Sequence, residues 1–323
     1  MAKSGESTLT VLLAMAANIG VAIAKLVAGV LTGSSAMLSE GAHSVGDTGT
    51  ELLLLTALKR SARPADRSHP FGYGKERYFW SLLASVSIFT AGALFSIYQG
   101  VTTLAGEPEE HQNVVVAYVV LAVAFLMEGT SLVQAVRQVR RERSEQQVGL
   151  RTYLRRSDDP TVTTVLFEDS TALVGLLLAF AGLALTQLTG YPVWDGIASL
   201  AIGLLLVVVA YGLGRSNMAL LIGRQADPQL VADVTTWLRD QSEVVAVVDI
   251  LTMLTGTDRV LLGARLDFDD RSTSDEIENA CVRMDEELRS AFPDLDEIFL
   301  TPVPRNDPEL RARVQARYGE LLG

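Results

Sequence analysis

The chain has 323 residues, of which 49% are apolar and 20% are charged, and its formal net charge is −11. An acidic chain of this kind is a poor candidate for binding nucleic acid, whose phosphates attract positive charge. The single Cys281 excludes a disulfide framework and a cysteine-based metal cluster. With three histidines in all, the chain also has no histidine-rich metal-binding tail.

The charge is divided unevenly along the chain. Residues 1–224 contain 17 acidic and 17 basic side chains, whereas residues 225–323 contain 21 acidic and 10 basic ones. Long apolar runs also end near Leu221. We therefore expect a membrane domain over 1–224, a soluble acidic domain over 225–310 and a C-terminal tail over 311–323.

Six stretches have the length of a membrane helix, which needs about 20 mostly apolar residues. These stretches are 9–32, 35–58, 78–104, 112–137, 161–188 and 194–217. The second is the least apolar because it carries several ionisable side chains, but a loop at that depth would leave backbone groups unpaired in lipid. The sequence thus predicts an α-helical bundle of six transmembrane helices.

Basic residues indicate how these spans are oriented. The connections 59–77 and 137–156 contain six and seven Lys or Arg residues, and the other three connections contain none. Basic connections favour the cytoplasmic side, so both termini are expected in the cytoplasm. The first span is too long for a cleaved signal peptide and no transit peptide is recognisable, which favours the cell (inner or plasma) membrane.

The last hundred residues have the pattern of a small α+β domain. The expected elements, in order, are a helix over 227–241, strands over 244–254 and 260–268, a helix over 274–291 and a strand over 298–303. The order αββαβ is typical of a two-layer, ferredoxin-like domain.

His43 and Asp47 are the most informative pair in the membrane part. They are four residues apart on the second span, so they face the same way about 6 Å apart along the helix axis. Imidazole and carboxylate together are suitable ligands for a divalent ion such as Zn²⁺. The simpler alternative is a His–Asp hydrogen bond that ties helices together.

Further carboxylates occur at a similar depth. Asp47, Glu128 and Asp169 each lie ~12–17 Å from the expected cytoplasmic face. Glu168 is adjacent to Asp169, and neighbouring residues on a helix point roughly 100° apart, so the two are not expected to face one site equally. With His43, these groups can hold a divalent cation, or they can form a proton relay without a metal.

Two further features are weaker. Asp66 and His69 lie in a loop and can bind a metal weakly, although a capped turn leading into the third span is the simpler reading. Asn18 and Lys25 are polar residues of the first span, and the sequence does not identify a partner for Lys25.

Residues Gly33–Asp47 and His69–Arg77, in this order and at this spacing, resemble the cation diffusion facilitator family. Leu166–Asp169 and Met127–Gly129 resemble the branch of that family that includes zinc transporter nine. The resemblance covers nearly the whole chain. It implies a homodimer that exchanges cytoplasmic Zn²⁺, or a similar ion, for protons by alternating access.

The resemblance also implies a ligand set. The family's transport site uses two ligands each from the second and fifth spans, which here are His43, Asp47 and Asp169. The remaining position is Val165, which cannot coordinate a metal, and the candidates for its place are Glu168, Glu128 and water. Because the family's site uses the second and fifth spans, we expect Glu168 as a ligand or as a partner of the ligands, and Glu128 as a nearby proton carrier. In many members a loop site uses the equivalents of Asp66, His69 and a third residue, which here is Tyr73, so the resemblance implies a weakened site. Histidines that bind zinc in the soluble domain of many members have no equivalent here, so we expect that domain to serve dimerisation.

The expected function is therefore a Zn²⁺/H⁺ antiporter and not an enzyme, with the divalent ion, protons, the lipid bilayer and a second copy of the chain as its partners. Transport of Mn²⁺, Fe²⁺ or another divalent ion is the closest alternative. A membrane-embedded, metal-dependent hydrolase and a metal sensor are alternatives from other classes.

Overall fold

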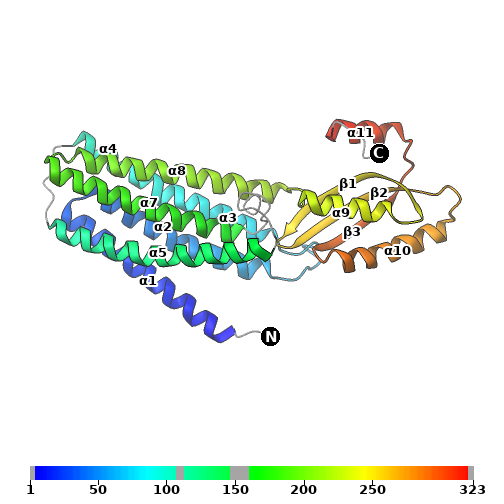
Figure 1. Ribbon diagram of the computed structural model, residues 1–323, viewed down its shortest axis with the longest axis horizontal. Coiled ribbons are helices and arrows are strands. Elements are labelled where there is room, and N and C mark those ends of the chain that lie inside the picture. The colour runs from blue at the N-terminus through cyan, green and yellow to red at the C-terminus, as the bar shows by residue number, and fades with distance from the viewer. Residues whose placement is uncertain (1–3, 107–112, 146–159, 319–323) are drawn as a thin grey trace. The chain divides into compact units, whose positions relative to one another are not determined.

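The computed structural model describes residues 4–106, 113–145 and 160–318 (Figure 1). Histidine 111 and most of the connection 137–156 lie outside these residues. The chain divides into two compact units. Residues Met1–Lys59 and Glu76–Met218 form the first, and Arg60–Lys75 and Ala219–Gly323 form the second. The loop Arg60–Lys75 thus groups with the C-terminal part of the chain, which its position between two spans did not suggest.

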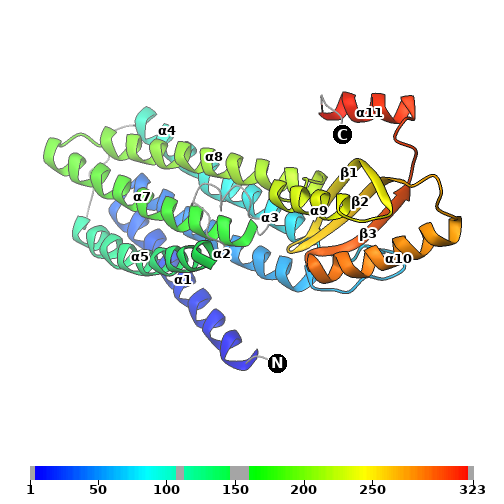
Figure 2. The same cartoon turned by 45° about the vertical axis from the view of Figure 1, so that its right-hand side comes forward.

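The first unit is a bundle of long helices (Figures 1 and 2). In chain order they are α1 (Ser4–Thr32), α2 (Ser35–Ser61), α3 (Glu76–Ser87), the π-helix η1 (Ile88–Leu94), α4 (Phe95–Ala105), α5 (Val114–Glu145), α7 (Pro160–Thr189) and α8 (Val193–Ile222). Helices α3, η1 and α4 follow one another without a break and correspond to the third predicted span.

Five helices in the described part of the chain are long and apolar enough to cross a membrane. They comprise Met15–Thr32, Glu76–Ala105, Val114–Arg141, Thr163–Thr189 and Val193–Ile222. Helix α2 is more polar, as the sequence indicated, and it buries Glu40, His43 and Ser44 within the bundle. A multi-pass helical membrane bundle is therefore confirmed, with α2 protected by its neighbours.

The π-helix was not predicted, because residues 78–104 read as one continuous apolar helix. A π segment inserts an extra residue into a turn, and such segments occur frequently at functional sites. Here the segment lies beside α2: a Cβ added to Gly92 would be 3.9 Å from the Cα of His43. That distance is an ordinary contact, so the π segment lies against α2 at the level of the His43–Asp47 pair. The tighter neighbour of Gly92 is Leu206 of α8, whose Cδ1 would be 3.0 Å from the same Cβ.

The second unit contains a three-stranded sheet, and its elements are close to those predicted. They are α9 (Pro228–Arg239), β1 (Val244–Gly256), β2 (Arg259–Phe268), α10 (Ser274–Ala291), β3 (Leu295–Pro302) and α11 (Pro308–Tyr318). The strand order is β1-β2-β3, with β1 and β2 antiparallel and β2 and β3 parallel. The predicted small α+β domain with the order αββαβ is confirmed, and α11 follows it.

Local sequence determines the ends of the helices in this unit. The Asp227 side chain accepts a hydrogen bond from the Gln229 amide at the start of α9. At the start of α10, Thr273 and Glu276 form a capping box.

The loop Arg60–Lys75 packs closely against the β1–β2 turn of the same unit. The approach is tight at Gly74, where an added Cβ would clash with the carbonyl oxygen of Thr255.

A buried carboxylate joins two helices in the first unit. Asp195 of α8 is fully buried and accepts hydrogen bonds from the hydroxyls of Ser34 and Ser35, at 2.7 and 2.8 Å, and from the backbone amides of Ser35 and Ala36. These amides belong to the first turn of α2, where helical N–H groups lack partners within the helix and favour negative charge. Asp195 thus caps α2 from another helix and fixes where the polar helix begins.

We expect Asp195→Ala to lower the melting temperature of the detergent-solubilised protein by several degrees. Each buried donor left without an acceptor costs roughly 1–3 kcal/mol. Asp195→Asn is the matched control, because it keeps one acceptor oxygen and should lose less. A melting temperature for Asp195→Ala equal to that of the wild type would contradict the capping role.

Candidate functional site

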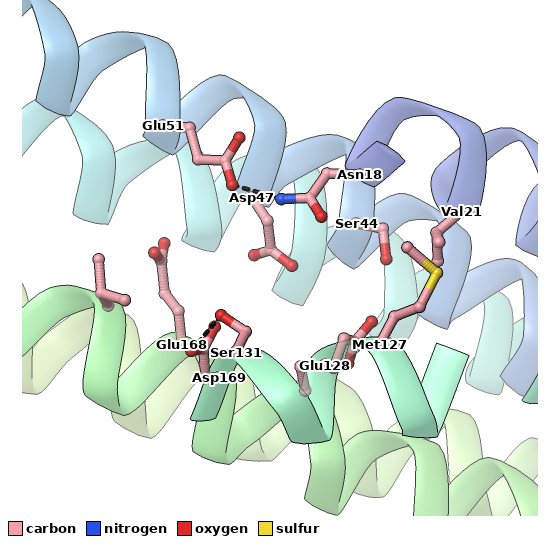
Figure 3. A pocket seen from close by; sticks show the side chains of 12 residues that line it. Asn18, Val21, Ser44, Asp47, Glu51, Met127, Glu128, Ser131, Glu168 and Asp169 are labelled. Atoms are coloured by element: carbon pink, nitrogen blue, oxygen red, sulfur yellow. Dashed lines mark hydrogen bonds between the residues drawn. The ribbon is translucent and has the colours of Figure 1, made fainter. Parts of the chain in front are cut away.

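A cavity of about 110 Å³ lies within the first unit, between α1, α2, α5 and α7 (Figure 3). Eight of the twelve residues that line it are polar or ionisable, although the surrounding helices are apolar. The lining residues are Asn18, Val21, Ser44, Asp47, Glu51, Met127, Glu128, Ser131, Val165, Glu168, Asp169 and Ala172. A cavity lined by several carboxylates among membrane helices is costly and indicates a function.

Four of the predicted carboxylates meet at this cavity. Asp47 comes from α2, Glu128 from α5, and Glu168 and Asp169 from α7. Figure 3 shows Asp47 and Glu168 pointing toward one another across it. Both adjacent acids of α7 reach the same cavity, although their positions on the helix differ by roughly 100°. Val165, whose side chain has no atom that can bind a metal, also lines the cavity beside these carboxylates.

Two polar side chains donate hydrogen bonds to carboxylates that line the cavity. The sequence alone did not assign either of them to the site. Ser131 of α5 donates a hydrogen bond of 2.8 Å to Asp169 Oδ2. Asn18 of α1 donates one to Glu51 Oε1 (Figure 3). Asn18 was noticeable as an amide in an apolar span, whereas a serine such as Ser131 gives no signal in a membrane helix.

His43 lies beside this cavity without lining it. Its Nδ1 is 3.2 Å from Asp47 Oδ1, so the predicted i,i+4 pair is in contact. The imidazole is buried, and its Nε2 has no hydrogen-bond partner among the described residues. Asp47 Oδ1 also has no hydrogen-bond partner among the described residues, so the pair is close without being hydrogen-bonded. The imidazole therefore has one nitrogen free to bind a further group.

The partners of Lys25, which the sequence did not identify, are two carboxylates and a hydroxyl. Lys25 Nζ lies 3.1 Å from Glu40 Oε2, 2.6 Å from Glu128 Oε1 and 2.9 Å from Ser44 Oγ. Lys25 and Glu40 are fully buried. Glu128 thus lines the cavity and also forms an ion pair with the buried Lys25.

The loop residues Asp66 and His69 form a capped turn. Asp66 Oδ1 accepts hydrogen bonds of 2.8 Å from the amides of Ser68 and His69, and Asp66 Oδ2 accepts one of 2.7 Å from the Tyr73 hydroxyl. These bonds, the one from Tyr73 most of all, lower the pKa of Asp66 below its ordinary value. His69 Nδ1 is 3.7 Å from Asp66 Oδ1, too far for a good hydrogen bond. Both oxygens of Asp66 are thus already in use.

Among the described residues, no three His, Cys, Asp or Glu side chains are grouped tightly enough to hold a metal ion as they stand. The carboxylates instead surround a space that a cation can enter. Asp47, Glu128 and Asp169 line it together, so their charges repel one another when the carboxylates are ionised. Such a cavity attracts cations, and a divalent ion can draw the carboxylates together.

Comparison with known proteins supports this view of the membrane part. Residues 11–222 match the family model of the cation efflux transmembrane domain. This range covers all the cavity-lining residues and all the helices of the first unit except the start of α1.

Three relatives are informative. The proton-coupled zinc antiporter SLC30A9, mitochondrial, of Xenopus laevis is 37% identical over 76% of this chain and 44% of its own length. Metal tolerance protein C4 of Arabidopsis thaliana is 33% identical over 89% of this chain and 61% of its own. More distantly, the manganese efflux system protein MneP of Bacillus subtilis is 20% identical over 90% of this chain and 93% of its own. The chain thus spans about half the length of the frog and plant relatives.

Proposed function

Because this chain belongs to the cation efflux family, the cation diffusion facilitators, we propose that it is a Zn²⁺/H⁺ antiporter that exports a divalent cation by alternating access. The observation that supports the proposal best is the cavity in which Asp47, Glu128, Glu168 and Asp169 meet within a membrane bundle. Ionised carboxylates at that depth cost free energy unless a cation neutralises them, and a role in binding the transported cation explains why they are there.

The proposed ligands are His43 and Asp47 from α2 together with Glu168 and Asp169 from α7. Glu168 takes the position that Val165 cannot fill, and its unpartnered Oε1 supports this role. His43 brings a nitrogen ligand once its ring turns toward the ion, and its Nε2 has no competing partner among the residues that the structure describes. One imidazole and three carboxylates satisfy the four-coordinate preference of Zn²⁺.

Proton exchange follows from the chemistry of these ligands. A metal binds to deprotonated groups, so its entry expels protons from the imidazole and the carboxylates. After the ion leaves on the other side, protons rebind, neutralise the carboxylates and allow the empty site to return across the low-dielectric bundle. Glu128, at the cavity wall, is the proposed proton carrier. Rocking of helices around a fixed site would give alternating access.

Manganese is the second candidate ion. Most of the potential ligand atoms on the cavity wall are carboxylate and hydroxyl oxygens, and oxygen donors suit Mn²⁺ better than they suit Zn²⁺. The name of the Bacillus relative refers to manganese efflux, whereas that of the frog relative refers to zinc. Fe²⁺ shares enough of this ligand preference to be included in a competition experiment.

We place the protein in the cell (inner or plasma) membrane with both termini in the cytoplasm. The Lys and Arg residues of 59–77 and 137–156 support this orientation. We also propose a homodimer formed through the domain 225–310, where Val245, Val282 and Phe299 expose apolar side chains. The loop pair Asp66 and His69 would at most bind a metal weakly, because the turn already uses Asp66.

We expect His43→Ala and Asp47→Ala each to abolish metal uptake by reconstituted vesicles loaded with a zinc-sensitive dye. Each variant removes a proposed ligand, and His43 is buried, so folding is checked alongside uptake. Size-exclusion chromatography controls for folding, and Asp66→Ala, outside the cavity, should retain most of the uptake. Normal uptake by Asp47→Ala would show that the ion binds elsewhere.

The two carboxylates whose roles differ in the proposal can be separated by neutral, isosteric variants. Glu168→Gln should weaken zinc affinity at least tenfold in calorimetry, because it removes a charged ligand. Glu128→Gln should leave zinc affinity nearly unchanged and flatten the pH dependence of transport, because it removes a proton carrier. The opposite pattern would mean that the two roles are exchanged.

Val165 offers a gain-of-affinity test. Because Val165 lines the cavity, Val165→His adds a nitrogen ligand where the wall has none. We expect zinc to bind about tenfold more tightly or better, with a smaller gain for Mn²⁺. Val165→Leu is the matched apolar control and should not tighten binding. Equal zinc affinity in Val165→His and the wild type, with folding intact, would place the metal away from this wall.

A further inference from the structure

The ammonium of Lys25 lies in an environment normally associated with a bound metal ion. Three oxygen atoms surround it at 2.6–3.1 Å, from Glu128 of α5 and from Glu40 and Ser44 of α2. The lysine comes from a third helix, α1, and its side chain is fully buried. Each hydrogen of the ammonium therefore has an acceptor, and the charge is shielded from solvent.

The carboxylates around Lys25 carry more negative charge than one ammonium neutralises. Glu40 Oε1 and Glu128 Oε2 are buried and have no hydrogen-bond partner among the described residues. Glu40 is pressed against α7, since a Cβ on Gly175 would clash with Glu40 Oε1. Two carboxylates share one cation, so removing that cation would leave an unbalanced pair of buried negative charges.

The oxygen cluster is continuous with the candidate transport cavity. Ser44 and Glu128 contact Lys25 and also line the cavity. Figure 3 shows the two side chains close together at one end of it. A mobile cation in the cavity would therefore reach Glu128 directly if the lysine did not hold this carboxylate.

We propose that Lys25 is a tethered cation that permanently occupies a second cation position beside the transport cavity, formed by Glu40, Ser44 and Glu128. By occupying it, Lys25 holds Glu128 out of the coordination of the transported ion and limits the cavity to one metal ion. Lys25 is thus a positioning and specificity-determining residue, and this inference rests on the proposed function of the cavity.

The donor set indicates which ion the position would accept without the lysine. All three ligand atoms are oxygens, two of them from carboxylates, and such sites favour hard divalent cations such as Mn²⁺ over Zn²⁺. A cavity with two adjacent cation positions would then bind mixed or paired ions. The tethered ammonium prevents this without adding a ligand that competes for zinc.

The test is the metal stoichiometry of the purified full-length protein, measured with Mn²⁺ and with Zn²⁺ by isothermal titration calorimetry. The variants are Lys25→Met, Glu128→Gln and the double variant K25M/E128Q. Metal bound to the acidic surface of the second unit is common to all variants, so differences from the wild type report on the bundle. Mn²⁺ electron paramagnetic resonance gives a second reading, since two neighbouring Mn²⁺ ions broaden each other's signal.

We expect Lys25→Met to bind one more Mn²⁺ per chain than the wild type, with dipolar broadening, and to bind Zn²⁺ less selectively against Mn²⁺ by tenfold or more. The double variant should return to the wild-type stoichiometry, because only one carboxylate of the second position remains. Glu128→Gln should keep the stoichiometry and a zinc dissociation constant within threefold of the wild type.

If folded Lys25→Met binds the same number of metal ions with the same selectivity as the wild type, Lys25 serves only as a packing contact and the inference is wrong. If Lys25→Met does not fold, Glu128→Gln decides: a tenfold loss of zinc affinity would show that Glu128 coordinates the metal. Failure of the proposed function has a different signature, since the wild type would then give no metal uptake in vesicles and its cavity variant Asp47→Ala would bind metal as the wild type does.

Discussion

The electrostatic cost of ionisable side chains in hydrocarbon determines how this bundle is built. Even lenient insertion scales assign roughly 2.5–3.5 kcal/mol to a charged residue at the centre of a membrane helix. Helix α2 carries Glu40, His43 and Asp47, and such a helix is stable only when protein surrounds it. Its neighbours supply what lipid cannot: an ammonium from α1, a capping carboxylate from α8, and the polar walls of a shared cavity.

Charge balance divides the carboxylates into two groups. Glu40 and Glu128 share the fixed ammonium of Lys25, whereas Asp47, Glu168 and Asp169 line the cavity without contacting that ammonium. The second group contacts no Lys or Arg in the described part of the chain and can be neutralised by a metal ion or by protons. Because a metal ion and protons can each neutralise the same carboxylates, binding of one displaces the other, and this competition is the physical basis of their exchange.

The sequence predicted features that depend on local spacing. The i,i+4 contact of His43 with Asp47 and the succession of elements αββαβ in the soluble domain both follow from residues close together in the chain. Contacts between helices were not predictable in the same way. Lys25 and Glu128 are 103 residues apart, and nothing in either sequence context pairs them. The reach of Glu168 into the cavity was underestimated, because helix geometry fixes the direction of Cβ and not that of a flexible carboxylate. The π-helix Ile88–Leu94 has an ordinary apolar composition and so gave no signal.

The central claim is that the transported ion binds where α2 and α7 face one another. X-ray absorption spectroscopy of the zinc-loaded protein tests it directly, because the chain contains three histidines and one cysteine. The account predicts one imidazole nitrogen and otherwise carboxylate oxygens at about 2.0–2.2 Å from zinc, with the imidazole signal lost in His43→Ala. A first shell with sulfur, or with two or more imidazoles, or an imidazole signal that persists in His43→Ala, would contradict it.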